Sequence, residues 1–278
     1  MLKILKKGLD YLDEPRGIGR PRRTMKRNIK LQISYQGTNY HGWQRQKGQP
    51  TIQGTLEDAI AKMTNEPVSL IGSGRTDAGV HALCQTANFF TSRDIPTHGF
   101  VKGLNSLLPP DISILGAEEV PADFHARKSA REKTYIYRIV TSPNRLPLVH
   151  KRAWNVKEKL EITPMKEAAG PLMGTHDFSS FMAAGSSVKT TVRTITKIDI
   201  RATLCPEYDP MNIEECQISV SANGFLRYMV RNIVALLYQV GTGKLPPQEA
   251  ETILKAADRA KTPPTAPPWG LYLVEVQY

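Results

Sequence analysis

Cysteine is scarce in this sequence, with only three residues among 278: Cys84, Cys205 and Cys216. The number is odd and no two have CxxC spacing, which argues against a disulfide framework and against a cysteine zinc site. Long apolar runs are also missing, so no segment approaches the length of a transmembrane helix. The apolar part of the first seven residues is too short for a signal peptide. We therefore expect a cytoplasmic protein that does not engage a membrane.

Several cofactor motifs are absent as well. No GxGxxG follows a strand into a helix, and the stretch 241–244 lacks both the earlier glycine and the hydroxyl residue of a phosphate-binding loop. The histidines His81, His125 and His176 are widely separated and form no metal-type pair, so each is better read as a satisfied or surface residue. The sequence predicts no metal ion and no organic cofactor.

Charge of one sign is in excess, with 37 basic against 26 acidic residues and a formal net charge of +11. Such a balance favours a polyanionic partner, and nucleic acid is the leading candidate. No basic amphipathic helix of the interfacial type supports a membrane surface instead. Residues 1–24 resemble a flexible basic extension rather than part of the core. A second basic group is expected to contact phosphates: Arg127, Lys128, Arg131 and Lys133.

Glycine is concentrated in the stretch 71–82, where three glycines occur within eight residues around Asp77. Glycine permits tight turns and close approach of the backbone to a ligand. The flanking apolar segments, 68–71 and 80–90, predict a strand, a tight turn and a second strand. Spacing alone favours an ordinary hairpin turn, for which Asp-Ala-Gly is normal turn chemistry. The alternative is a carboxylate held at the turn for catalysis.

The periodicity of apolar residues predicts two halves with a similar order of elements. The first half reads as strand, helix, strand, strand, helix, strand, which is the order of a ferredoxin-like unit; its predicted elements are 28–35, 51–63, 68–71, 80–90, 97–108 and 112–115. The second half is expected to contain a strand near 135–140, helices over 164–172, 225–240 and 247–257, a loop over 174–181, and strands over 192–203, 215–221 and 270–276. We therefore predict an α+β fold whose halves, 25–130 and 131–278, share a largely antiparallel sheet and leave a basic cleft between them.

Two features keep alternative readings open. Arg231 borders the apolar face of the predicted helix over 225–240, where it either pairs with a carboxylate such as Asp77 or extends to water. The loop 35–44 contains Tyr35, Tyr40 and Trp43 together with several amides. These aromatic side chains suit stacking on bases, but they equally suit pinning a long loop to the core.

With these residues in view, the chain resembles the TruA family of tRNA pseudouridine synthases over about 26–278. The resemblance rests on GRTDAGVHA at 74–82, supported by shorter motifs in the family's order, among them YQGT at 35–38, FHAR at 124–127, HDF at 176–178 and MVRN at 229–232. The first 24 residues are extra. The resemblance implies a two-lobed α+β enzyme that works as a homodimer, binds tRNA without metal or cofactor, and modifies uridines 38 to 40 of the anticodon stem-loop.

The resemblance also implies roles for single residues. Asp77 is expected to be the nucleophile or anion stabiliser, and whether it attacks C1′, attacks the base or removes a sugar proton stays open. Arg231 is expected to keep Asp77 ionised, since a nearby cation lowers the pKa of a carboxylate. Tyr135 is expected to stack on the uracil and to help remove the C5 proton. The remaining predicted substrate contacts are Arg75, Gln85, Arg127, Leu271 and Leu273.

Two alternative functions accompany this interpretation. The first is an RNA-binding or RNA-chaperone protein that keeps the fold without catalysis, which the presence of Asp77, Tyr135 and Arg231 argues against. The second is a pseudouridine synthase of the same fold that acts on another RNA, and the motifs do not separate it from the tRNA enzyme.

Overall fold

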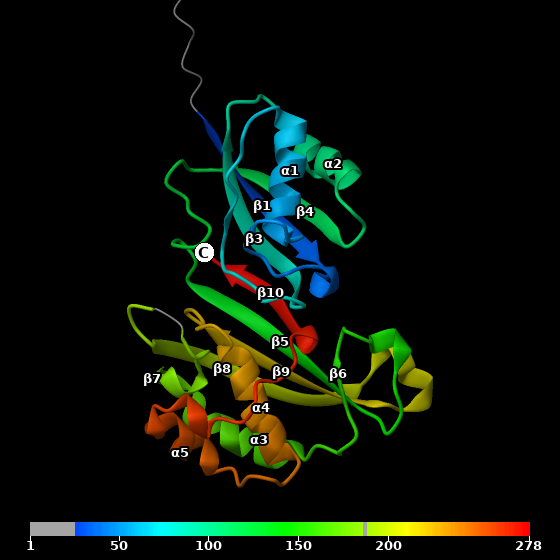
Figure 1. Ribbon diagram of the computed structural model, residues 1–278, viewed down its shortest axis with the longest axis vertical. Coiled ribbons are helices and arrows are strands. Elements are labelled where there is room, and N and C mark those ends of the chain that lie inside the picture. Colours follow the sequence, from blue (N-terminus) through cyan, green and yellow to red (C-terminus); the bar gives the residue numbers. More distant parts are fainter. Residues whose placement is uncertain (1–25, 186–187) are drawn as a thin grey trace, which may run out of the picture.

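The computed structural model describes residues 26–185 and 188–278, so the expected basic extension at 1–24 lies outside the described residues. Within them the strands form one ten-stranded sheet in the order β4-β1-β3-β10-β5-β9-β8-β7, with β2 on β3 and β6 on β5. The pairings are antiparallel except those of β10 with β3 and of β6 with β5. The predicted α+β fold with a largely antiparallel sheet is confirmed (Figure 1).

The N-terminal half has the strand order β4-β1-β3, with β2 on the far side of β3. This order and the two crossing helices match the ferredoxin-like arrangement that the sequence predicted. Its elements are β1 (Arg27–Tyr35), α1 (Ile52–Thr64), β2 (Ile71–Gly72), β3 (His81–Thr91), α2 (Thr97–Leu107) and β4 (Ile112–Val120).

The C-terminal half repeats the pattern as β10-β5-β9-β8. Its main elements are β5 (Glu132–Thr141), α3 (Ile162–Ala169), β8 (Val192–Leu204), β9 (Glu214–Ala222), α4 (Met229–Gly241) and β10 (Leu271–Gln277). Three shorter elements are added: β6 (Trp154–Val156), β7 (Gly174–Asp177) and α5 (Glu249–Ala256).

Two local predictions are wrong. The segment 174–181 is not all loop, because its first four residues pair with the start of β8 and form the edge strand β7. The helix predicted over 225–240 begins only at Met229, because Tyr228 has a φ of 66°, which is incompatible with an α-helix. Leu226 and Arg227 therefore precede α4 instead of lying on its face.

Alternation of apolar residues places β1 in the sheet. Ile29, Leu31 and Ile33 are fully buried, because alternate residues of a strand point to the same face and that face lies under α1 and α2 (Figure 1). The helix α1 begins where the Thr51 hydroxyl accepts a hydrogen bond from the Gly54 amide, and it ends at Asn65 in the left-handed conformation.

The loop after β1 uses its aromatic residues to anchor itself. Tyr35, Tyr40 and Trp43 are 3%, 8% and 2% exposed, so their rings belong to the core rather than to a surface for stacking on bases. Of the two readings that the sequence left open, the core reading is correct.

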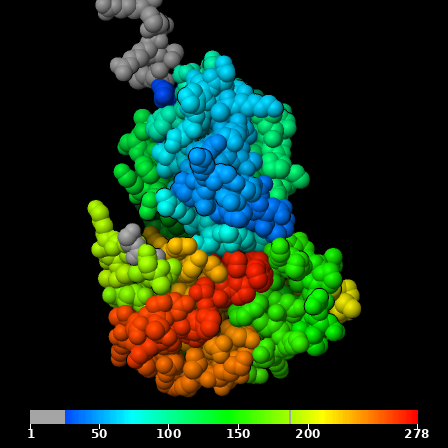
Figure 2. Space-filling model, viewed as in Figure 1, coloured from blue at the N-terminus to red at the C-terminus, as the bar shows by residue number. Residues whose placement is uncertain are grey.

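Strand β10 joins the two halves. It runs antiparallel to β5, with Leu271 opposite Tyr137, and parallel to β3, with Tyr272 opposite His81. In the space-filling view the C-terminal segment lies between the blue N-terminal half and the orange part of the C-terminal half (Figure 2). Because one sheet crosses this boundary, the division into 25–130 and 131–278 stays a prediction. No helix of the described residues combines the length and apolar character needed to cross a membrane.

Candidate active site

The loop 73–80 leads from β2 to β3 and carries Asp77. Backbone hydrogen bonds close it at both ends, from Ser73 N–H to the Thr86 carbonyl and from Val80 N–H to the Asp77 carbonyl. Gly79 has a φ of 78°, a conformation that glycine adopts without strain, and there the chain turns back into β3. The strand, turn, strand order that the sequence predicted is therefore present.

The side chain of Gln85 forms hydrogen bonds to the start of this loop. Its Oε1 accepts a hydrogen bond from the Ser73 hydroxyl at 2.5 Å, and its Nε2 donates to the Gly74 carbonyl at 3.1 Å. The side chain is fully buried. The sequence placed Gln85 among the substrate contacts, but this position suits support of the loop rather than contact with a ligand. A second brace joins the Tyr35 hydroxyl to the Thr76 hydroxyl at 2.8 Å.

Asp77 is paired with Arg231, which lies 154 positions further along the chain in the first turn of α4. Arg231 Nη1 is 3.3 Å from Asp77 Oδ2, and its Nε donates to the Ala266 carbonyl at 2.8 Å. The two side chains are 28% (Asp77) and 12% (Arg231) exposed. The pairing alternative for Arg231 is confirmed, and the ion pair points Asp77 toward the C-terminal half.

Burial raises the pKa of the Asp77 carboxyl above its ordinary value, and the charges of Arg231 and Arg227 act in the opposite direction. Arg231 therefore favours the ionised carboxylate, as the sequence predicted. The net shift is upward, because loss of water around the carboxyl outweighs the effect of the two arginines.

Tyr135 lies on β5 beside this carboxylate. It is 7% exposed and packs edge-to-face on Phe225, with ring centroids 5.1 Å apart. Burial raises the pKa of the Tyr135 hydroxyl well above its ordinary value, and the nearby Tyr35 and Asp77 add to this. The phenol is therefore neutral.

The two leucines of β10 lie in the same region. Leu273 is opposite Tyr135 and Leu271 is opposite Tyr137 in the antiparallel register, so their side chains share one face of the sheet with the tyrosines. Both leucines are buried. The structure thus brings together Asp77, Arg231, Tyr135 and the predicted apolar wall.

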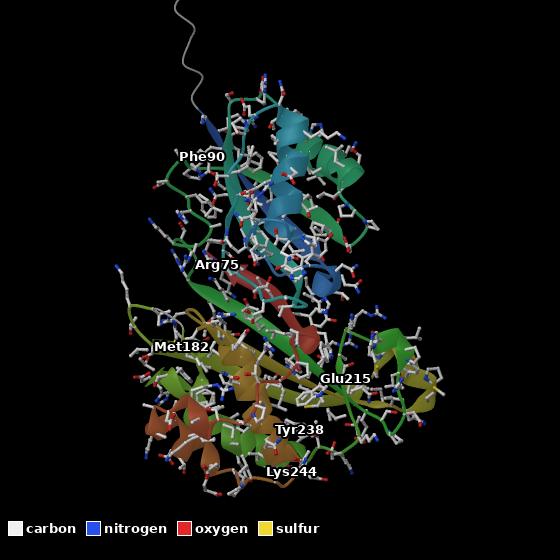
Figure 3. The ribbon with its side chains drawn as sticks, viewed as in Figure 1. Arg75, Phe90, Met182, Glu215, Tyr238 and Lys244 are labelled. Atoms are coloured by element: carbon white, nitrogen blue, oxygen red, sulfur yellow. The ribbon has the colours of Figure 1, made fainter. Side chains whose placement is uncertain are left out.

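The predicted contacts Arg75 and Arg127 are exposed. Figure 3 shows Arg75 at the level where the N-terminal half meets β5 and β10. Arg127 lies near Lys133, whose pKa its charge helps to lower. Neither arginine touches Asp77, so a role for them requires a ligand that extends over the loop.

Lys133 has a contact that the sequence did not reveal. Its ammonium donates to the Ser73 carbonyl at 2.6 Å, at the start of the loop that carries Asp77. Burial, with a smaller effect from Arg127, lowers the pKa of Lys133 to about 8. The available signal was its position two residues before Tyr135, at a spacing that puts both side chains on one face of a strand.

His81 is a satisfied core histidine, as expected. Its Nδ1 accepts a hydrogen bond from Gly37 N–H at 3.1 Å, and its Nε2 lies 3.0 Å from the Lys151 carbonyl and 3.1 Å from the Trp269 carbonyl. These contacts require a proton on Nε2 only, so the imidazole is neutral. His81 thereby ties the start of β3 to three separate segments.

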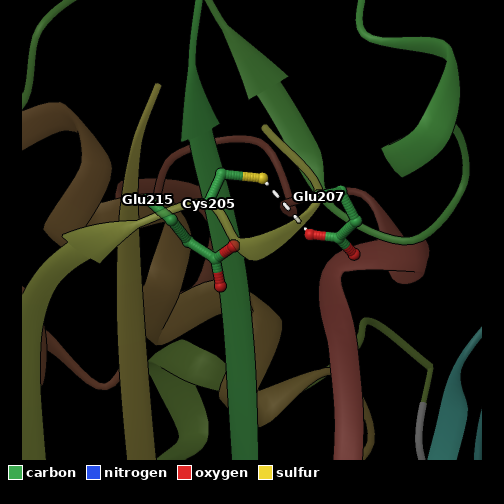
Figure 4. Close-up of side chains that lie close together, drawn as sticks. All are labelled: Cys205, Glu207 and Glu215. Atoms are coloured by element: carbon green, nitrogen blue, oxygen red, sulfur yellow. Dashed lines mark hydrogen bonds between the residues drawn. The ribbon is translucent and has the colours of Figure 1, made fainter. Parts of the chain in front are cut away.

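A second polar cluster lies away from this site, where Cys205, Glu207 and Glu215 approach one another (Figure 4). Arg138 Nη2 is 2.9 Å from Glu207 Oε2 and 2.7 Å from Glu215 Oε2, and Glu215 is fully buried. Since one guanidinium serves both carboxylates, this cluster is a buried ion-pair network rather than a set of free metal ligands.

Two concave regions of the described residues lie away from Asp77. One of about 530 Å³ lies beside α5 and includes His176 and Lys255. The other, of about 670 Å³, lies over the loop 45–51. The basic cleft between the halves therefore stays a prediction.

Comparison with known proteins assigns the chain to a family. A family model described as tRNA pseudouridine synthase matches residues 32–127 and 168–278. The chain belongs to the tRNA pseudouridine synthase family. The family's reaction is an isomerisation, and the chain is accordingly classed with the isomerases.

Individual relatives agree with the family. The chain is 48% identical over 252 residues to "tRNA pseudouridine synthase A" of Caldicellulosiruptor bescii, and 47% identical to the protein of the same name from Thermoanaerobacter sp.. Each match covers 91% of this chain and 100% of the relative. A chain of a solved Cbf5-Nop10-Gar1 complex aligns over 88% of this chain and 58% of its own length, at 13% identity and a TM-score of 0.31.

Proposed function

We propose that this member of the tRNA pseudouridine synthase family converts uridine to pseudouridine at positions 38 to 40 of the anticodon stem-loop, with Asp77 as nucleophile. One observation carries the role of Asp77. Its carboxylate is partly buried on a braced loop, faces Arg231 at 3.3 Å, and lies close enough to Tyr135 to raise the pKa of that phenol. The choice of positions 38 to 40 follows the family resemblance.

The reaction needs no outside reagent, because its product has the same atoms as its substrate. The uridine leaves the base stack, which costs a few kcal/mol. Asp77 attacks C1′ as the N1–C1′ bond breaks, so the uracil leaves with the electron pair of that bond. After the uracil turns, C5 bonds to C1′ and releases the carboxylate. C5 then loses its proton and N1 gains one. A covalent step divides one difficult displacement into two easier ones.

Tyr135 has a narrower role than the sequence suggested. A raised pKa disfavours the phenolate, so the tyrosine is a poor base for the C5 proton at neutral pH. Its ring, on the same sheet face as Leu273, is suited to stacking on the uracil. We assign it this contact and leave proton transfer to a group or water near N1 and C5.

The basic residues around the loop are proposed to hold the RNA backbone. Arg75 and Arg127 are exposed, and Lys133 is partly buried beneath the loop. Phosphate contacts release counterions, so log affinity for tRNA should fall linearly as log salt concentration rises. The slope known for duplex DNA is roughly 0.9 per neutralised phosphate. Binding that does not change with salt would contradict this part.

The family resemblance also underlies two broader proposals, that the enzyme is a homodimer and that it acts in the cytoplasm. Light scattering of the purified protein measures the first, since a monomer has a mass of 31.0 kDa and a dimer twice that. Fractionation of cells that express the tagged protein tests the second.

The decisive test compares wild type with Asp77→Asn on an unmodified tRNA transcript. Pseudouridine is mapped by chemical labelling and primer extension, and tRNA binding is measured in parallel. Asp94→Asn is the matched control, because Asp94 is a fully exposed carboxylate away from the site. We expect product at 38 to 40 with wild type and control, and binding without product for Asp77→Asn. An active Asp77→Asn variant would remove the nucleophile from the proposal, and product at other positions would remove the anticodon assignment.

A further inference from the structure

Tyr228, the residue immediately before α4, has an unusual backbone conformation. Its φ is 66° and its ψ is 0°, which places a bulky residue in the left-handed region that glycine and asparagine tolerate best. Such strain persists where the surrounding structure requires it, and it is frequent at functional sites. Here it interrupts a sequence whose apolar pattern would otherwise continue the helix to 225.

The strained conformation brings the Tyr228 ring next to two arginines. The guanidinium carbon of Arg231 lies 4.6 Å from the ring centroid and that of Arg227 lies 4.8 Å from it. Arg227 also donates a hydrogen bond to the Tyr228 hydroxyl at 3.2 Å. Both distances are within the range of cation–π attraction.

Arg231 is therefore held from three directions. Asp77 takes one terminal nitrogen, the Ala266 carbonyl takes Nε, and the Tyr228 ring supports the guanidinium group. The charges that act on the Asp77 carboxyl are those of Arg231 and Arg227, and both of these arginines contact Tyr228. Among the described residues no hydrogen bond joins Tyr228 to Asp77, so the effect of the tyrosine on the carboxylate is indirect.

We propose that Tyr228 is a positioning residue that holds Arg231 and Arg227 against the Asp77 carboxylate. This inference rests on the proposed function of Asp77 as the nucleophile. It gives a role to the left-handed conformation of Tyr228, in which the ring lies next to both guanidinium groups.

Three substitutions of Tyr228 test the aromatic ring separately from the bulk of the side chain and from the backbone conformation. Tyr228→Phe keeps the π-system, Tyr228→Leu keeps the bulk without it, and Tyr228→Gly relieves the backbone strain while removing the ring. The control is Tyr238→Leu, which removes a buried tyrosine near Lys244 on the other end of α4 (Figure 3). Single-turnover rates at saturating tRNA, dissociation constants and melting temperatures are measured for all four.

We expect Tyr228→Phe to stay within about 3-fold of the wild-type rate, since the attraction to both cations remains. Tyr228→Leu and Tyr228→Gly should be slower by about 10- to 100-fold with little change in tRNA affinity, because misplacement of a catalytic group by about 1 Å costs this much. Tyr238→Leu should lower the melting temperature but not the rate. Equal rates for Tyr228→Leu and wild type, or recovery of the rate in Tyr228→Gly, would overturn the proposal.

A second readout does not depend on activity. The Asp77 carboxyl carbon is followed by NMR as the free protein is titrated. In Tyr228→Leu its titration midpoint should shift to higher pH, because Arg231 no longer stabilises the carboxylate, and in Tyr228→Phe it should stay at the wild-type value. An unshifted midpoint in Tyr228→Leu refutes the positioning role even if the proposed reaction itself fails. If the wild-type protein proves to be inactive, the proposed reaction is refuted. A midpoint that shifts in Tyr228→Leu still supports the positioning role in that case.

Discussion

Replacing Lys133 with methionine should make the protein more stable and the enzyme slower. The pKa of Lys133 is lowered from 10.5 to about 8, a difference of 2.5 units. At 1.36 kcal/mol per unit, the folded protein holds the charged lysine at pH 7 at a cost of about 3 kcal/mol. This is an upper figure, because part of the side chain meets solvent. Methionine fills similar space without a charge, so it removes the cost.

The pH dependence gives this prediction its sign. Between pH 8 and 10.5 the unfolded chain binds more protons at Lys133 than the folded protein does, so the contribution of Lys133 to wild-type stability rises with pH in this window. The advantage of Lys133→Met should therefore be greatest at neutral pH, shrink to roughly 1 kcal/mol at pH 10, and vanish above the unfolded pKa. A gain of 1 kcal/mol corresponds to a melting temperature higher by about 2–4 °C in a chain of this size class.

The assay is thermal unfolding of wild type, Lys133→Met and the control Lys102→Met at pH 7 and pH 10. Lys102 is an exposed residue of α2 without a resolved contact to the site. Other groups titrate equally in all three proteins, so the differences isolate Lys133. The single-turnover rate of Lys133→Met should fall, because the Ser73 carbonyl loses its donor and the loop that carries Asp77 loses a brace. A stability difference that does not change between the two pH values would falsify the reasoning.

Two further predictions concern stability away from Asp77. Arg138→Met should lower the free energy of unfolding by about 3–5 kcal/mol, because it removes the ion-pair partner of the fully buried Glu215. Urea unfolding should show that the double variant Arg138→Met/Glu215→Leu regains most of the lost stability. A double variant as unstable as the single one contradicts the explanation. Burial lowers the pKa of His81 below 6.5, so the stability contributed by the neutral imidazole is complete above pH 6.5 and is lost as pH falls through the folded-state pKa. Urea unfolding at pH 7.5 and pH 5 should show a larger loss for wild type than for His81→Gln, and equal losses would count against this.

The local pattern of the sequence predicted most of the fold. In β1 and β5 apolar residues alternate, and in α4 they form one stripe. These residues are the ones that leave water when the chain folds, so their spacing in the sequence predicts the type of element and its buried face. The errors occur where tertiary contacts overrule that pattern. The segment 174–177 forms a strand only because β8 offers an edge to pair with, and the apolar residues at 225–226 are excluded from α4 by the conformation of Tyr228.

The sequence by itself determined the family, the identity of Asp77 as the carboxylate on a glycine-containing turn, and the basic character that suits RNA. These are properties of residue type and spacing, which the chain carries before it folds. Only the tertiary structure decided that Arg231 pairs with Asp77, that Gln85 and Lys133 hold the loop from beneath, and that burial raises the pKa of the carboxyl. The physical reason is that charge pairing and desolvation depend on distances in space, and the two members of the central ion pair are 154 positions apart.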